Sequence, residues 1–146
     1  MTITENSKDY LWTADGDLYI DPNSNGGPEV ASFRRDEIIS SSIFKRLNST
    51  QGDWEDFPTL GADLTDFVGL PNTRETAALI EGRIYNTLVQ DLLIRSEDIA
   101  VDIVPIGQNT ILVMVLISSL ENESPVVTGF SFDMRDNIMI PRIINV

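Results

Sequence analysis

The residues of this sequence whose types and spacing could do chemistry are mainly carboxylates and short polar side chains. Residues 21–26, Asp-Pro-Asn-Ser-Asn-Gly, match the first half of a calcium-binding loop, in which alternate oxygen ligands surround the ion and glycine allows a sharp turn. The second half does not match, because position twelve of such a loop is Ser32, where a bidentate glutamate is needed. Pro22 is also unfavourable there. We therefore interpret the segment as a surface turn and predict no metal ligand.

A second candidate is the acidic group formed by Asp53, Glu55 and Asp56 around Trp54. Burial raises the pKa of a carboxyl group and sugars stack on tryptophan, so this pattern suits the acid of a glycoside hydrolase. Such an enzyme also needs a second carboxylate at a fixed distance, and nothing in the sequence fixes one there. These acids are therefore predicted to be solvated loop residues beside a packed tryptophan, with a carboxylate-based peptidoglycan hydrolase as the alternative function.

The composition excludes several classes of function. The 146 residues include neither histidine nor cysteine, which removes the commonest general base, thiolate nucleophiles, disulfides and the usual zinc ligands. Asp and Glu outnumber Lys and Arg by 23 to 10, and the formal charge of −13 repels nucleic acid and anionic membranes. Residues 1–10 contain no apolar signal core, and residues 111–117, the longest apolar run, are too short to cross a bilayer. We expect a non-enzymatic protein without catalytic residues, metal or cofactor.

Three arginines, Arg74, Arg83 and Arg95, lie on or near the longest predicted helix. In so acidic a chain, each guanidinium group is expected to pair with a carboxylate. Pairing within the fold and pairing with a partner both stay open for each of them.

The N-terminal part is predicted to contain a hairpin and a loop. Residues 10–20 alternate between apolar and polar side chains on both sides of an Asp-Gly pair, which accepts positive φ. The turn-forming residues 21–28 continue as a surface loop. Residues 1–8 are expected to be flexible or bound by a partner.

Two amphipathic helices are predicted from apolar side chains at helical spacing. The first covers residues 32–47, and the second begins after Asn72 and runs to about Asp91. Asn72 and Glu75 have the spacing of a capping box, and Gly82 within the helix suggests a close contact there. The apolar stripes are Ile39, Ile43 and Leu47 in the first helix, and Ala77, Ile80, Ile84, Leu88 and Leu92 in the second.

The rest of the chain predicts an irregular segment and a sheet. Residues 51–71 are rich in glycine and proline yet apolar, so they should pack onto the domain or a partner. Residues 110–118 are almost wholly apolar and are expected to be buried on both faces. The other predicted strands cover residues 99–103, 126–132 and 138–144. The chain is thus predicted to be one α+β domain over residues 1–146, with an N-terminal hairpin and two main helices packed on a small, mostly antiparallel C-terminal sheet.

Short motifs follow one another in a defined order between residues 9 and 118. They are Arg46-Leu47, Gly52-Asp53-Trp54, Pro58, Gly61-Ala62-Asp63-Leu64 and Phe67, followed by the helix from Asn72. This order resembles the baseplate wedge family of contractile phage tails, the sheath initiators or lysozyme-like baseplate proteins shared with type VI secretion systems. Asp15-Gly16-Asp17-Leu18 resembles the acidic leader of that family. Many members carry a Glu-Pro-Arg triplet between helix and sheet, where this chain has Arg95-Ser96-Glu97-Asp98, so no contact of that triplet is carried over.

The resemblance implies a structural subunit of the virion tail baseplate, present in the host cytoplasm during assembly. Its partners would be the tail sheath protein, other baseplate wedge proteins and tail tube or hub proteins, within a six-fold hetero-oligomer. The first sheath ring would assemble by strand exchange with the C-terminal sheet, and a separate surface would meet the wedge. The residues expected at the strand-exchange site are Ile111, Val113, Val115, Ile117, Phe130, Phe132, Ile138 and Ile140. Those expected to meet the wedge are Trp54, Phe57, Leu64, Phe67, Arg74, Arg83 and Arg95.

A small acidic protein-binding module outside a virion is a further alternative. It would account for the composition but not for the order of the motifs.

Overall fold

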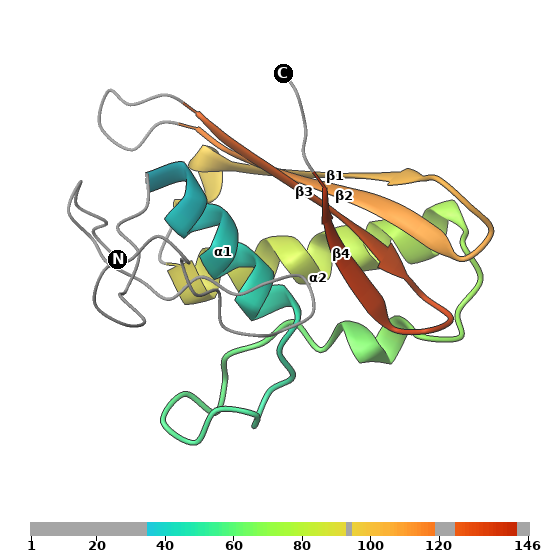
Figure 1. The fold of residues 1–146 in the computed structure, drawn as a ribbon, viewed down its shortest axis with the longest axis horizontal. Coiled ribbons are helices and arrows are strands. Elements are labelled where there is room, and N and C mark those ends of the chain that lie inside the picture. Colours follow the sequence, from blue (N-terminus) through green and yellow to red (C-terminus); the bar gives the residue numbers. More distant parts are fainter. Residues whose placement is uncertain (1–34, 93–94, 119–124, 143–146) are drawn as a thin grey trace, which may run out of the picture.

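The structure is a computed structural model that describes residues 35–92, 95–118 and 125–142. Within these ranges, two α-helices and a four-stranded antiparallel sheet form an α+β fold, which confirms the predicted class (Figure 1). The predicted hairpin at residues 10–20 and the turn at residues 21–28 lie outside the described residues, as do residues 1–8.

Helix α1, Arg35–Leu47, forms where the first apolar stripe predicts it. Ile39, Ile43 and Leu47 face the interior, and none is more than 4% exposed. Lys45 and Arg46 lie in its last turn, where positive charge interacts favourably with the carbonyl end of the helix. The predicted helix also included residues 32–34, which lie outside the described ranges.

Helix α2, Arg74–Leu92, begins differently from the prediction. Oγ1 of Thr73 accepts a hydrogen bond from the backbone N–H of Thr76 at 3.2 Å, so Thr73 caps the helix. The Asn72 amide instead donates to the carbonyl oxygen of Gly107 at 2.8 Å and ties the helix start to the turn between two strands. The predicted capping box from Asn72 to Glu75 is therefore wrong, because a distant backbone carbonyl engages the asparagine.

The buried stripe of α2 is confirmed at its centre, since Ile80, Ile84 and Leu88 have no exposed surface. Gly82 lies on the solvent side of the same helix, and a Cβ atom built there would meet nothing within 4 Å. The close contact predicted at Gly82 is therefore wrong.

The sheet has the strand order β1-β2-β3-β4, and all neighbours are antiparallel. Its strands are β1 Ile99–Pro105, β2 Thr110–Ile117, β3 Val126–Asp133 and β4 Ile138–Arg142. Both helices lie on the same side of the sheet, with α2 against β1 and α1 against β3 (Figure 1). We call the sheet face toward the helices the core face and the other the open face.

Strand β2 shows the effect of this one-sided packing. Ile111, Val113 and Val115 point to the core face and have no exposed surface. Leu112 and Met114 point to the open face and are partly exposed, and Leu116 there is 38% exposed. The expectation that this strand is buried on both faces is therefore wrong, since the described helices cover only one of them.

Candidate functional site

The β1 edge of the sheet carries unpaired backbone groups within the described residues. Hydrogen bonds from Ser118 N to Asp98 O at 2.8 Å and from Ile106 N to Thr110 O at 3.0 Å mark the two ends of the β1–β2 ladder. Bonded pairs alternate in an antiparallel ladder, so the even-numbered residues of β1 bond to β2. The backbone groups that face outward therefore belong to Ile99, Val101, Ile103 and Pro105, of which the first three have an N–H.

The β4 edge at the other side of the sheet offers less. Met134 N donates to Asn109 O at 2.7 Å, which fixes the even-numbered residues of β3 as those bonded to β2. The odd-numbered residues of β3 consequently bond to β4, and only Met139 and Pro141 of β4 face outward. Because proline has no N–H, this edge presents a single donor within the strand, and the two edges are unequal acceptors of an added strand.

The structure places most of the residues predicted for strand exchange inside the sheet rather than at its edges. β2 and β3 are paired on both sides, and each of their six predicted residues is at most 2% exposed. Only the two on β4 are accessible, with Ile138 50% and Ile140 42% exposed. Apolar alternation reveals a strand facing a core but not its place in the strand order, so Ile99, Val101 and Ile103 were missed. Pro141 was the available sequence signal, because proline is restricted to sheet edges and bulges.

A loop of residues 49–62, which we call the aromatic loop, joins α1 to the short 3₁₀ helix η1, Leu64–Phe67. It extends away from the helices and the sheet (Figure 1). Trp54 is 45% exposed and Phe57 is 64% exposed. Trp54 is therefore not packed within the described part of the domain, whereas the predicted contact with a partner requires an exposed ring of this kind.

The residues predicted to meet the wedge do not form one surface. Leu64 and Phe67 are only 4% and 6% exposed, because η1 turns both side chains into the core beside α2. They support the fold, whereas Trp54 and Phe57 of the aromatic loop remain available for contact.

The three predicted arginines also differ in their surroundings. Arg83 binds the Asp66 carboxylate at 3.1 Å and Ala62 O at 3.2 Å, and lies 5.2 Å from the centre of the Phe67 ring. Arg95 pairs with Glu97 at 3.2 Å and with Asp98 at 2.8 Å. Arg74 is exposed at the start of α2, and the structure records no carboxylate partner for it among the described residues.

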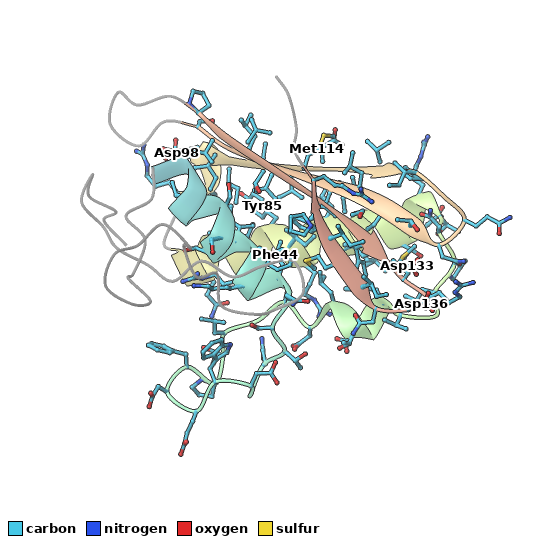
Figure 2. All side chains as sticks on the ribbon, viewed as in Figure 1. Phe44, Tyr85, Asp98, Met114, Asp133 and Asp136 are labelled. Atoms are coloured by element: carbon cyan, nitrogen blue, oxygen red, sulfur yellow. The ribbon has the colours of Figure 1, made fainter. Side chains whose placement is uncertain are left out.

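The acids considered for hydrolysis are Asp53, Glu55 and Asp56, and all three are exposed in the aromatic loop. One oxygen of Asp53 accepts the N–H of Thr50 at 2.8 Å, as expected of a turn residue. Elsewhere, Asp133 and Asp136 lie together at the β3–β4 turn, and Asp98 lies toward the opposite end of the sheet (Figure 2). The acids of the aromatic loop, of the β3–β4 turn and of the segment before β1 therefore lie on different elements of the fold.

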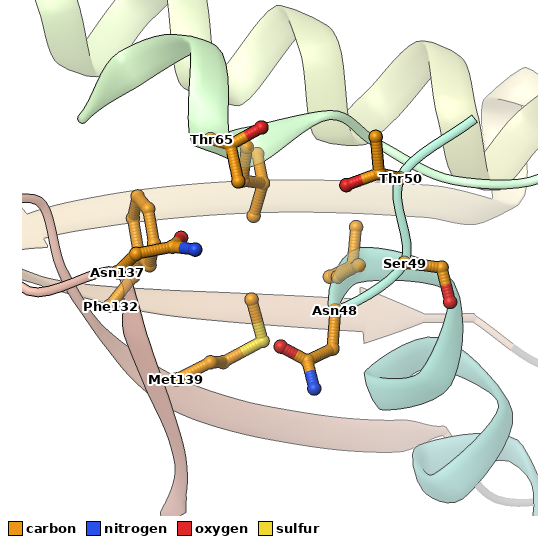
Figure 3. A pocket seen from close by; sticks show the side chains of 9 residues that line it. Asn48, Ser49, Thr50, Thr65, Phe132, Asn137 and Met139 are labelled. Atoms are coloured by element: carbon orange, nitrogen blue, oxygen red, sulfur yellow. The ribbon is translucent and has the colours of Figure 1, made fainter. Parts of the chain in front are cut away.

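A small cavity of about 80 Å³ lies between the end of α1, η1 and the β3–β4 turn (Figure 3). Phe132 and Met139 give it an apolar side, and the amides of Asn48 and Asn137 point toward it (Figure 3). None of its nine lining residues carries a titratable group. This cavity therefore has no acid or base to catalyse a reaction.

Among the described residues, no group of three or more Asp or Glu side chains is arranged to hold a metal ion. Neither helix is both long enough and apolar enough to cross a membrane, as far as the structure describes them.

Comparison of the chain with protein-family models, curated proteins and solved structures finds no match in any of the three.

Proposed function

We propose that this protein is a structural subunit of a contractile phage tail baseplate that joins the wedge to the tube base and initiates sheath assembly. Two considerations support the proposal. The ordered motifs between Arg46 and Asn72 resemble the sheath-initiator family. The β1 edge, which no described residue pairs with, supplies the physical means, because backbone pairing at a sheet edge gives affinity with little demand on side-chain identity.

The main observation behind the proposal is that the β1 edge presents more outward-facing backbone N–H groups than the β4 edge. An added strand would receive hydrogen bonds from Ile99, Val101 and Ile103 along β1, but from Met139 alone along β4. On the core side it would also lie beside Val101 and Ile103, whose apolar side chains are only partly buried. Pairing at β1 would therefore extend both the hydrogen-bond ladder and the apolar layer above α2.

In this role the protein performs no chemistry. The sheath protein would contribute the additional strand, and wedge, tube or hub proteins would hold the subunit in a six-fold assembly. The partners and location that follow are those of a virion baseplate, with assembly in the host cytoplasm.

The test is sheath assembly in vitro. The protein and its purified wedge partners are mixed with the sheath protein encoded nearby, and sheath-capped complexes are counted by electron microscopy. We expect omission of the protein to abolish capping, and Val101→Pro to reduce it by about tenfold or more, because proline removes the central outward donor. Thermal unfolding of the variant shows whether the fold is retained.

The matched control acts at the other edge. Pro141→Ala supplies a new outward N–H on β4 and should leave capping unchanged. Normal capping by a folded Val101→Pro variant, or by mixtures without the protein, would refute the acceptor role of β1. A deletion beyond Ser124 cannot serve as the test, because it removes the buried Phe130 and Phe132 and therefore the core.

A further inference from the structure

The aromatic loop, residues 49–62, is held in one shape by its own hydrogen bonds. Ala62 N donates to Ser49 O at 3.1 Å where the two ends meet, and Gly52 N donates to Pro58 O at 2.9 Å within the loop. Gln51 N also donates to the Asp63 carboxylate at 2.7 Å. A loop ordered before binding loses less conformational entropy when a partner docks.

This ordered loop presents two aromatic rings. Nine consecutive residues, 51–59, are exposed, and they include Trp54 and Phe57. The Trp54 indole N–H donates to Ser49 Oγ at 3.1 Å, so one edge of the ring is fixed while nearly half of the side chain stays exposed. Large rings held on a preformed surface are the side chains that contribute most to protein interfaces.

The charge of the loop determines which partner fits. Residues 49–62 contain three acids and no lysine or arginine. Glu55 and Asp56 lie between the two aromatic residues in the sequence, are exposed, and have no recorded ion pair among the described residues. Nucleic acid and anionic membranes would be repelled, whereas a cationic side chain between the rings would be attracted.

We propose that the aromatic loop docks an arginine-bearing segment of a partner protein. A planar guanidinium group stacks on the Trp54 ring and pairs with the carboxylate of Glu55 or Asp56, while an apolar neighbour in the same segment covers Phe57. Arginine is favoured over lysine because its flat, weakly hydrated cation both stacks on a ring and binds a carboxylate with two donors. The inference is independent of the strand pairing proposed at β1, but it deepens the proposed wedge contact, for which Trp54 and Phe57 were predicted.

The experiment titrates the full chain with the peptide acetyl-Arg-Leu-Arg-Leu-Arg-amide. Trp12→Phe leaves Trp54 as the sole tryptophan, so its fluorescence and its indole N–H signal in nuclear magnetic resonance report contact directly. Matched peptides replace arginine with lysine or with uncharged citrulline. We expect the arginine peptide to bind about fivefold more tightly than the lysine peptide, and the citrulline peptide not to bind.

Two double variants that remove the same amount of negative charge show whether binding depends on the acids of the loop or on the acidic surface in general. The double variant Glu55→Gln/Asp56→Asn should weaken binding by about tenfold. Glu75→Gln/Glu81→Gln alters two exposed acids of α2 and should leave binding nearly unchanged. Phe57→Ala should also weaken binding of the arginine peptide, since it removes the second aromatic ring of the loop.

Three outcomes would overturn the proposal. The first is that no peptide changes the Trp54 signals at concentrations up to about 1 mM. The second is that the arginine and citrulline peptides bind equally tightly. The third is that Glu55→Gln/Asp56→Asn binds the arginine peptide as tightly as the unchanged loop does. Binding of the loop to phosphatidylcholine vesicles, lost in Phe57→Ala, would assign it to a lipid surface instead. None of these results depends on sheath assembly, so the two proposals fail separately.

Discussion

The indole Nε1–H of Trp54 donates a hydrogen bond to Oγ of Ser49, 3.1 Å away. The same hydroxyl donates to the carbonyl oxygen of Lys45 at 2.6 Å. An exposed ring is thereby linked through a buried serine to the last turn of α1. The position of Trp54 in the aromatic loop thus depends on the end of the helix as well as on the loop.

Ser49→Ala should break both of these bonds. It leaves the Lys45 carbonyl oxygen and the Trp54 N–H without this partner, and we expect the free energy of unfolding to fall by about 1 kcal/mol. In a Trp12→Phe background, the fluorescence anisotropy of Trp54 should also fall, because the ring is freer to move. Thr59→Ala, at an exposed site in the same loop, is the control and should change neither quantity.

Gly61 closes the aromatic loop, and its substitution should be costly. Its φ of +134° lies in the region that favours glycine, and a Cβ atom there would lie 2.6 Å from Ser49 O and 2.8 Å from the Thr50 carbonyl carbon. Because both contacts are to backbone, no side-chain rotation relieves them. We expect Gly61→Ala to lower the free energy of unfolding by about 2 kcal/mol or more, measured by urea denaturation.

Gly82→Ala tests the same change in an open site and should have the opposite sign. Gly82 lies in the interior of α2 with free space around its Cα atom, so alanine adds helix propensity without a clash. We expect a gain of about 0.5–1 kcal/mol in the same denaturation experiment. A loss there would show that the sequence-based expectation of a close contact at Gly82 is right after all.

Local patterns in the sequence predicted the elements, because helical and alternating apolar spacing reflects burial on one face. The spacing of Ile39, Ile43 and Leu47 indicated α1, and the strands were expected close to their observed positions. Contacts between residues far apart in the chain were not predictable in this way. The Asn72 amide binds a carbonyl oxygen 35 residues away, and no local rule shows that this bond replaces the expected cap.

In the candidate site too, local features were predictable from the sequence, whereas features that depend on long-range contacts were not. The sequence indicated an aromatic and acidic loop at residues 53–57, but left open whether the Trp54 ring packs on the domain or is exposed to a partner. It indicated a sheet of three or four strands, but not which of them are edges, because strand order depends on how the chain returns to the sheet. Leu64 and Phe67 were assigned to a partner surface since a glycine- and proline-rich segment gives no period from which to deduce their direction.

Two of the residues predicted for strand exchange should respond very differently to truncation. Ile111 has no exposed surface, and we expect Ile111→Ala to lower the free energy of unfolding by about 2–5 kcal/mol through the cavity that it leaves. Ile138 is 50% exposed on the edge strand, and Ile138→Ala should cost less than about 1 kcal/mol. Urea denaturation of both variants measures the difference, and equal losses would contradict the burial described for β2.

Asp133 holds the turn between β3 and β4 through two backbone hydrogen bonds. Its carboxylate accepts the N–H of Asp136 at 3.0 Å and that of Arg135 at 2.8 Å. These bonds, with the one from Asp136 as the largest contribution, lower the pKa of Asp133 below its usual 3.8. Because the pKa is lower in the folded than in the unfolded state, the ionised carboxylate stabilises the fold fully above about pH 4. That contribution is lost as the pH falls through the lowered pKa of the folded state.

Asp133→Asn should therefore be less stable than the wild type near neutral pH, and the difference should shrink below about pH 4 as the wild-type carboxylate takes up its proton. Urea denaturation at a series of pH values from about 7 to about 3 measures this convergence. Asp136→Asn is the matched control, because it keeps the backbone N–H that binds Asp133 and alters only an exposed ion pair with Arg135. A stability difference between Asp133→Asn and the wild type that stays constant across this pH range would show that the charge of Asp133 does not hold the turn.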